Sequence, residues 1–207
     1  MIKEITNDLE IIPEYELTKE TVKIMICDDV KRPGVDSLMN WLENESDYFV
    51  CPASSRGRHG SRFGGLMLHG LSVFKNLYDL NRRKELGLRR SSMVVMGLFH
   101  DICKANSYQW EDKWVKVDGE WKLQKKVVYS GDFPCGHGEK SVIILQKFIP
   151  LTDPEIMAIR WHMGWLDQGV HGYPGQHNYN AAKKQYIEIG ALMIADIEAA
   201  AIDEFDN

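Results

Sequence analysis

The sequence predicts an all-α fold, a bundle of helices with one β-hairpin inserted at about residues 108–129. Apolar residues recur at intervals of three or four along most of the chain, which is the helical period. Only the inserted stretch alternates in the manner of strands, on both sides of an Asp-Gly turn. The length of 207 residues suits one domain with an insertion and allows a sizeable core.

Composition narrows the classes of protein that we consider. The formal charge of −5 is spread along the chain, so we expect no stable binding to duplex nucleic acid. The four cysteines form no CxxC pair and no secretory leader precedes them, which indicates a reducing cytoplasm. No apolar run approaches the roughly twenty residues of a membrane span, so we expect a soluble cytoplasmic protein without membrane contact.

Residues 1–53 are interpreted as an N-terminal helical packing segment to which we assign no chemistry. A polar, proline-interrupted lead-in extends to about Tyr15, and helical spacing then begins near Thr18 and stops at Asp28–Asp29. A second helix is predicted to begin with Asp36 as its cap.

Residues 54–207 are predicted to form the functional core, which opens with a loop rich in Gly and Ser. This loop holds Arg56, Arg58, His59 and Arg62, which we consider as substrate-binding residues. Glycines permit close approach to a phosphate group, and guanidinium groups match its oxygens. The alternative is a solvated turn.

The next two helices carry the first candidate ligands. A helix that opens at Gly64-Gly65 and runs to about Lys84 places His69 on its apolar face, although a single inward histidine is more often a hydrogen-bonded core residue. The following helix is almost wholly apolar and ends in His100-Asp101. Both groups need partners if they are buried, whereas the alternative is that His100 caps the helix and Asp101 faces water.

The hairpin is predicted from Tyr108–Val117 and Glu120–Tyr129, which flank Asp118-Gly119. Its tryptophans could cover a site, stack on a base, contact a second subunit or simply pack onto the helices.

Three further helices are predicted after the hairpin. The first opens around His137. The second begins with the capping-box sequence at residues 152–155 and ends at His162. The Gly-rich stretch Gly164–Asn180 is interpreted as a loop, and a final helix from about Lys184 to Ala201 follows.

Asp196 interrupts the otherwise apolar run of that last helix. An unpaired carboxylate there would be costly, so it caps a helix, pairs with a cation or coordinates a metal ion.

A common property links six polar residues, because each lies on or at the end of a helix that otherwise reads as buried. These are His69, His100, Asp101, His137, His162 and Asp196. The set His69, His100, Asp101 and Asp196 would form a mixed shell suited to manganese, iron or another first-row divalent ion. His137 and His162 could hold a second ion, with Asp101 bridging the pair, and two such ions form a clamp for phosphate ester hydrolysis.

The order of these residues resembles the motif of the HD-domain metal-dependent phosphohydrolase superfamily, over about residues 54–201. His137 and His162 look like the extra ligands of its two-metal members. The runs Gly-Gly-Leu-Met-Leu-His69, Phe99–Lys104 and Gly136-His137-Gly are similar to the HD domain of bacterial 3′-to-5′ exoribonucleases.

The resemblance implies an HD-domain helical fold, phosphomonoesterase or phosphodiesterase activity, a nucleotide-like substrate, and a place for Lys104 beside the metal-bound phosphate. It does not extend to the oligonucleotide-binding domain of the exoribonucleases, since residues 1–53 lack a strand pattern, so we expect no processive RNA degradation. The hairpin has no counterpart in that family.

We therefore predict a phosphohydrolase that cleaves a phosphate mono- or diester of a nucleotide or short oligonucleotide through a metal-activated hydroxide. Asp101 and Lys104 would be catalytic, with two divalent ions as cofactors, manganese or iron first and Ni, Co, Zn or Mg as alternatives. Two other interpretations stay open: a degenerate HD-domain module that binds a nucleotide or a partner without cleavage, and a plain helical domain with satisfied core histidines. Six tryptophans also suggest a homo-oligomer.

Overall fold

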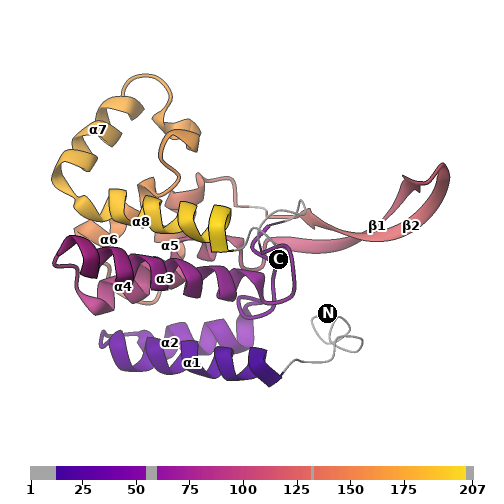
Figure 1. Cartoon of the computed structure of the whole chain (residues 1–207), viewed down its shortest axis with the longest axis horizontal. Coiled ribbons are helices and arrows are strands. Elements are labelled where there is room, and N and C mark those ends of the chain that lie inside the picture. The colour runs from indigo at the N-terminus through magenta and orange to yellow at the C-terminus, as the bar shows by residue number, and fades with distance from the viewer. Residues whose placement is uncertain (1–12, 55–59, 132, 204–207) are drawn as a thin grey trace.

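The computed structural model describes residues 13–54, 60–131 and 133–203. Figure 1 shows helices stacked in layers, with one long hairpin that projects from the end of the bundle. The elements are α1 (Pro13–Asp29), α2 (Val35–Asn40), α3 (Gly65–Lys84), α4 (Arg90–Phe99), β1 (Tyr108–Val117), β2 (Glu120–Tyr129), α5 (His137–Gln146), α6 (Asp153–Trp161), α7 (Gly175–Gln185) and α8 (Ile187–Glu198).

The layers are built around α3 and α4. In Figure 1, α1 and α2 lie on one side of this pair, and α8 lies on the other. Helix α3 contacts both α4 and α8, while α6 contacts α4, α5 and α8. One apolar cluster joins the layers, because Ile26 of α1, Leu77 of α3, Met96 of α4 and Leu192 of α8 all belong to it and are buried. No helix in the described part of the chain is both long and apolar enough to span a membrane.

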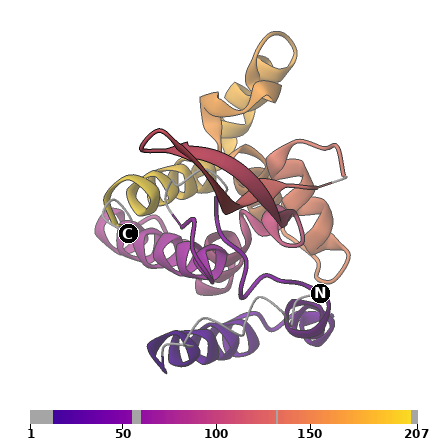
Figure 2. The same ribbon diagram turned by 90° about the vertical axis from the view of Figure 1, so that its right-hand side faces the viewer.

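The structure confirms the predicted helical bundle with an inserted β-hairpin. Tyr108 pairs with Tyr129 and Val117 pairs with Glu120 in the antiparallel register. Asp118 (φ 52°) and Gly119 (φ 89°) both adopt the positive φ that a tight two-residue hairpin turn requires. In Figure 2 the hairpin points toward the viewer and crosses in front of the bundle.

Two boundaries in the N-terminal segment differ from the prediction. Helix α1 begins at Pro13, not near Thr18. Proline is well suited to the first turn of a helix, because its φ is already helical and its missing N–H would be unpaired there. Helix α2 is preceded by Gly34 as its cap, and Asp36 lies in the first turn, where its carboxylate suits the positive end of the helix dipole.

Helix α7 occupies part of the stretch that was predicted to be a loop. It begins at Gly175 and so includes His177, and its buried residues are Tyr179 and Ala182. So small a buried face leaves no recurrent apolar pattern in the sequence, which explains why the periodicity did not reveal the helix.

Glycines bring the central helices unusually close together. A Cβ atom on Gly97 of α4 would lie 2.7 Å from the Cα of Phe74 in α3, and a Cβ on Gly70 would lie 2.8 Å from the carbonyl oxygen of Leu98. On the other side of the site, a Cβ on Gly138 of α5 would lie 2.2 Å from the carbonyl oxygen of Arg160 in α6. Both helix pairs therefore meet backbone to backbone, next to candidate ligands.

Candidate metal centre

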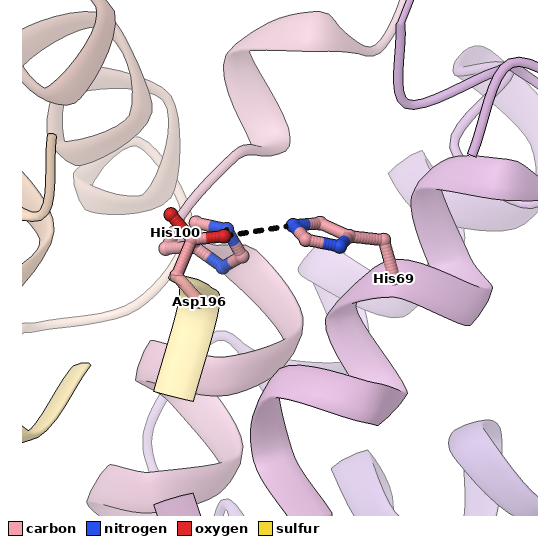
Figure 3. Close-up of side chains that lie close together, drawn as sticks. All are labelled: His69, His100 and Asp196. Atoms are coloured by element: carbon pink, nitrogen blue, oxygen red, sulfur yellow. Dashed lines mark ion pairs between the residues drawn. The ribbon is translucent and has the colours of Figure 1, made fainter. Parts of the chain in front are cut away.

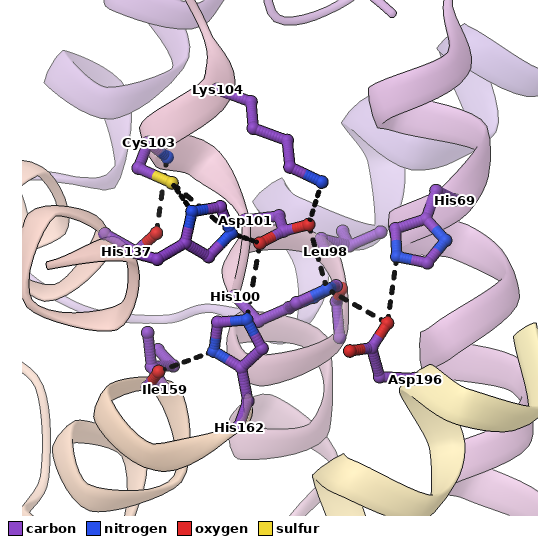
Figure 4. Close-up of polar contacts among 12 residues, drawn as sticks. His69, Leu98, His100, Asp101, Cys103, Lys104, His137, Ile159, His162 and Asp196 are labelled. Atoms are coloured by element: carbon purple, nitrogen blue, oxygen red, sulfur yellow. Dashed lines mark hydrogen bonds and ion pairs between the residues drawn. The ribbon is translucent and has the colours of Figure 1, made fainter. Parts of the chain in front are cut away.

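The six predicted ligands converge between the helices (Figure 4). They come from α3, from the ends of α4 and α6, from the start of α5 and from α8. The close packing of α3 on α4 sets the rings of His69 and His100 with centroids 5.3 Å apart. The packing of α5 on α6 likewise sets His137 and His162 at 5.5 Å.

Asp196 forms one side of the cluster with two histidines (Figure 3). Its Oδ1 atom lies 3.1 Å from Nε2 of His69 and 3.7 Å from Nε2 of His100. Both imidazoles are buried, whereas the side chain of Asp196 is 19% exposed. The carboxylate that interrupts the apolar face of α8 thus meets imidazoles from two other helices.

Asp101 stands at the centre of the cluster and divides its two oxygens between opposite sides. Its Oδ2 lies 3.6 Å from Nε2 of His100 and 2.5 Å from Nζ of Lys104. Its Oδ1 lies 3.3 Å from Nε2 of His162 and is hydrogen-bonded to Nε2 of His137. A carboxylate placed in this way can be shared between two cations.

Three groups of side chains in the described residues could each hold a metal ion. Ligand atoms within each group lie no more than 4.8 Å apart, and the groups are His69, His100 and Asp196; His100, Asp101 and His162; and Asp101, Cys103 and His137. This grouping differs from the two predicted shells. His137 is grouped with Asp101 and Cys103, and not with His162, because its ring lies on the side of Asp101 that faces Cys103.

Two of the histidines are held in the form that binds metal. Nδ1 of His100 lies 3.0 Å from the carbonyl oxygen of Gly97, and Nδ1 of His162 lies 2.7 Å from that of Ile159. A carbonyl can only accept, so in each neutral ring Nδ1 carries the proton and Nε2 presents its lone pair. Within the described residues, neither of these buried Nε2 atoms has a hydrogen-bond partner.

These lone pairs face negatively charged oxygens, which is unfavourable unless a cation lies between them. Burial lowers the pKa of His100 to about 4 in spite of the neighbouring carboxylates, so its ring is neutral at pH 7. Burial alone would raise the pKa of Asp101, but Lys104 and His137 hold it well below its usual range. The neutral imidazole of His100 beside ionised carboxylates is the kind of donor set that a divalent metal binds.

Asp196 is ionised for a related reason. Burial acts to raise its pKa, but close contact with His69 and the nearby His100 lowers it to about 2. Together with Asp101 this gives the centre two ionised carboxylates, whose charge one divalent cation would balance.

Of the two predicted substrate-binding residues that the structure describes, Lys104 and Arg62, Lys104 is joined to the cluster. A short 3-10 turn, Ile102–Lys104, follows Asp101 and brings the ammonium group back onto the carboxylate three residues earlier. Burial would lower the pKa of Lys104, but Asp101 raises it above its ordinary value, so the group stays charged. Arg62 is exposed in the loop before α3, and Arg56, Arg58 and His59 lie outside the described residues.

Cys103 is a candidate ligand that the sequence analysis missed. Its Sγ atom lies 3.4 Å from Nδ1 of His137, and its buried backbone N–H donates to the hydroxyl of Ser141. A signal was present, since Cys103 stands between Asp101 and Lys104, but the cysteines were considered only as pairs.

A buried cluster of imidazole, carboxylate and thiol groups that could hold metal ions is therefore the main feature of the site. Comparisons of the chain with protein-family models, with curated proteins and with solved structures found no significant match.

Proposed function

We propose that this chain is a metal-dependent phosphohydrolase of the HD-domain superfamily, which cleaves a phosphate mono- or diester of a nucleotide. One observation carries the proposal. The Nε2 lone pairs of His100 and His162 converge on the two oxygens of Asp101, with their Nδ1 protons engaged by backbone carbonyls. Such a centre is built to hold cations, and phosphate ester hydrolysis is the chemistry that paired cations commonly support.

The residues divide naturally between two ions. His69, His100 and Asp196 would hold one, and a second ion would be held around Asp101, either with His100 and His162 or with Cys103 and His137. Histidine and carboxylate ligands together suit manganese or iron. When bound, such ions supply activated water and neutralise charge on the phosphate.

The chain itself contributes position and charge. Lys104 is fixed beside Asp101, where its ammonium group can donate to a non-bridging oxygen of a phosphate and stabilise the charge that develops there. The backbone carbonyls of Gly97 and Ile159 keep two imidazoles in one tautomer, so no reorganisation is needed when substrate arrives.

The proposal is tested with protein purified without chelator, loaded with Mn²⁺ and assayed for phosphate release from a panel of nucleotides. Asp101→Ala should lower kcat by about 10³-fold or more while the helical circular dichroism spectrum is kept. Asp79→Ala, on the exposed surface of α3, is the matched control and should keep full activity.

If Asp101→Ala cleaves phosphate esters as well as the parent, the hydrolase assignment is wrong. Metal binding without turnover of any nucleotide would also contradict it and would leave a nucleotide-binding module.

A further inference from the structure

A cavity of about 300 Å³ opens beside the cluster, where the hairpin joins the bundle. It shares Lys104 and His137 with the cluster, and its other walls include Tyr108, Tyr129 and Lys140. The last three residues do not belong to the cluster of candidate metal ligands. A cavity of this size is at the lower end of ligand sites, which suits one small molecule and not an extended polymer.

Lys140 is the most unusual residue of this cavity. The residue is 8% exposed, and its Nζ atom contacts the Ser107 hydroxyl at 3.1 Å and lies 5.9 Å from the centroid of the Tyr129 ring. No ion pair joins Lys140 to any described carboxylate, and the described residues that line the cavity include none. Lys104, in contrast, is paired with Asp101.

A buried ammonium group without a counter-ion is costly, and an anion from solution would remove that cost. The chain as a whole carries a formal charge of −5, so general attraction for anions does not explain this local excess of positive charge. The positive charge of Lys140 therefore favours an anionic group in this cavity.

The two tyrosines add a flat apolar wall. Tyr108 and Tyr129 are directly opposite each other in the hairpin, so their side chains lie on the same face of the ribbon. Their ring centroids are 6.1 Å apart at an interplanar angle of 80°, and Tyr129 is 58% exposed although it lines the cavity. An exposed ring of this kind can stack on an aromatic group of a ligand.

We propose that this cavity, resting on the phosphohydrolase function proposed above, binds a phosphate monoester that carries one flat aromatic ring system. Lys140 is the counter-ion of the phosphate group, and Tyr129 contacts the ring. The base of the hairpin is thus part of the substrate site, and Lys140 is a binding residue.

The test is a calorimetric titration of the purified protein with three probes that cannot be hydrolysed: inorganic phosphate, methylphosphonate and phenylphosphonate. Lys140→Met removes the charge and keeps the length of the side chain, so affinity for all three probes should fall by about 10- to 100-fold. Lys140→Arg should keep most of the affinity. Lys147→Met, at an exposed position just after α5, should bind like the parent.

A second variant tests the aromatic wall. The parent should bind phenylphosphonate more tightly than methylphosphonate. Tyr129→Leu should remove most of this preference, and it should change the affinity for inorganic phosphate much less than Lys140→Met does, because Nζ of Lys140 lies 5.9 Å from the centroid of the Tyr129 ring but the ring carries no charge.

Thermal unfolding separates a binding role for Lys140 from a structural one. With a binding role, Lys140→Met has an unchanged or raised Tm, since an uncompensated buried charge is gone, and phosphate no longer raises that Tm. A lowered Tm with unchanged phosphate affinity would show a structural role and overturn the proposal. The proposal is equally wrong if the parent binds none of the probes at millimolar concentration.

The two proposals fail in different ways. Binding that depends on Lys140, without metal-dependent turnover, would keep the cavity assignment and reject the hydrolase. Metal-dependent turnover with the same KM in Lys140→Met and in the parent would keep the hydrolase and reject the cavity assignment.

Discussion

His162 illustrates how single side chains define the site. Its Nδ1 is held by the carbonyl oxygen of Ile159 at 2.7 Å, so its lone pair on Nε2 is directed at Asp101, 3.3 Å away. The ring is fully buried and cannot turn to water instead. A residue held in this way is prepared to bind a cation before the cation arrives.

Replacement of His162 with Gln should therefore lower metal affinity by more than the roughly 10- to 100-fold that follows loss of an outer hydrogen-bonding partner. His177→Gln is the matched control, since His177 is exposed on α7. Bound Mn²⁺ per protein, measured after equilibrium dialysis, should fall in the first variant and stay at the parent value in the second. Equal metal content in both variants would exclude His162 as a ligand.

The sequence was informative about the six polar ligands because each lies on or at the end of an otherwise apolar helix, which is visible as a local pattern. Cys103 and Lys140 could not be recognised in the same way. A cysteine resembles an apolar residue, and a lysine near a helix start normally faces water. Only the fold shows that Lys140 is covered where the hairpin joins the bundle.

Helix pairs that meet through glycine set the positions of these side chains. Gly97 lies three residues before His100 and admits the backbone of Phe74, so α3 and α4 approach closely enough for imidazoles from both to meet. Gly138 does the same for α5 and α6 beside His137. The geometry of the site therefore depends on the distance between the axes of the paired helices as much as on which residues are the ligands.

Gly97→Ala should lower the free energy of unfolding by about 1–3 kcal/mol, because the added methyl group meets backbone that cannot move aside. It should also weaken metal binding. Gly190→Ala on α8 is the control, since nothing lies within 4 Å of its added Cβ and alanine favours helix by up to about 1 kcal/mol. Urea unfolding of both variants measures the difference, and a neutral or stabilising Gly97→Ala would show that the helices have room to separate.

Glu155 fastens the N-terminal segment to the core. Both of its oxygens accept from Arg32, which lies between α1 and α2, and one also accepts from the backbone N–H of Thr152. Burial would raise the pKa of Glu155, but Arg32 outweighs this and lowers it. The ionised carboxylate therefore stabilises the folded state more than the unfolded state.

This pKa shift predicts the dependence of stability on pH. The contribution is complete above the ordinary glutamate pKa of about 4.3 and is lost as pH falls through the lower pKa of the folded state. Glu155→Gln should lose about 3 kcal/mol at pH 7 and show a shallower decline below pH 4. Unfolding measured at several pH values tests this, and parallel curves for parent and variant would contradict it.

Helices and strands could be predicted where a short stretch of sequence carries the pattern that identifies them. The hairpin was found from its alternation and its Asp-Gly turn, and α6 from its capping box, both of which the structure contains. The sequence does not reveal helix α7 because this helix buries few residues, and it predicts too late a start for α1 because a proline can either begin a helix or interrupt one. The grouping of the ligands depends on helix spacing, which no local pattern encodes.

Across the whole molecule, the bundle and the hairpin have different roles. The bundle contains the core and the candidate metal centre, whereas the outer part of the hairpin projects beyond it (Figure 1). Trp114, Trp121 and Leu123 there are more than half exposed. These side chains do not pack onto the helices, so simple packing onto the bundle is excluded as the role of the outer hairpin.

Replacing residues 111–126 with an Asn-Gly turn would join Trp110 to Val127, which are partners in the hairpin register. The Tm should change by less than about 4 °C, because few contacts with the core are lost, and phenylphosphonate binding should persist because Tyr108 and Tyr129 remain. Differential scanning calorimetry measures the first expectation. A much larger fall in Tm would show that the ribbon helps to hold the bundle together.

A ribbon of only two strands has no interior strand, so β1 and β2 each leave one row of backbone amides and carbonyls unpaired. Such rows attract the strands of other chains and seed fibrils. Lys113, Lys116 and Lys122 are exposed along this ribbon, and charged side chains on an edge strand, lysine above all, make pairing with the strands of neighbouring molecules unfavourable. The chain can therefore extend a long arm into solvent without becoming a template for its own aggregation.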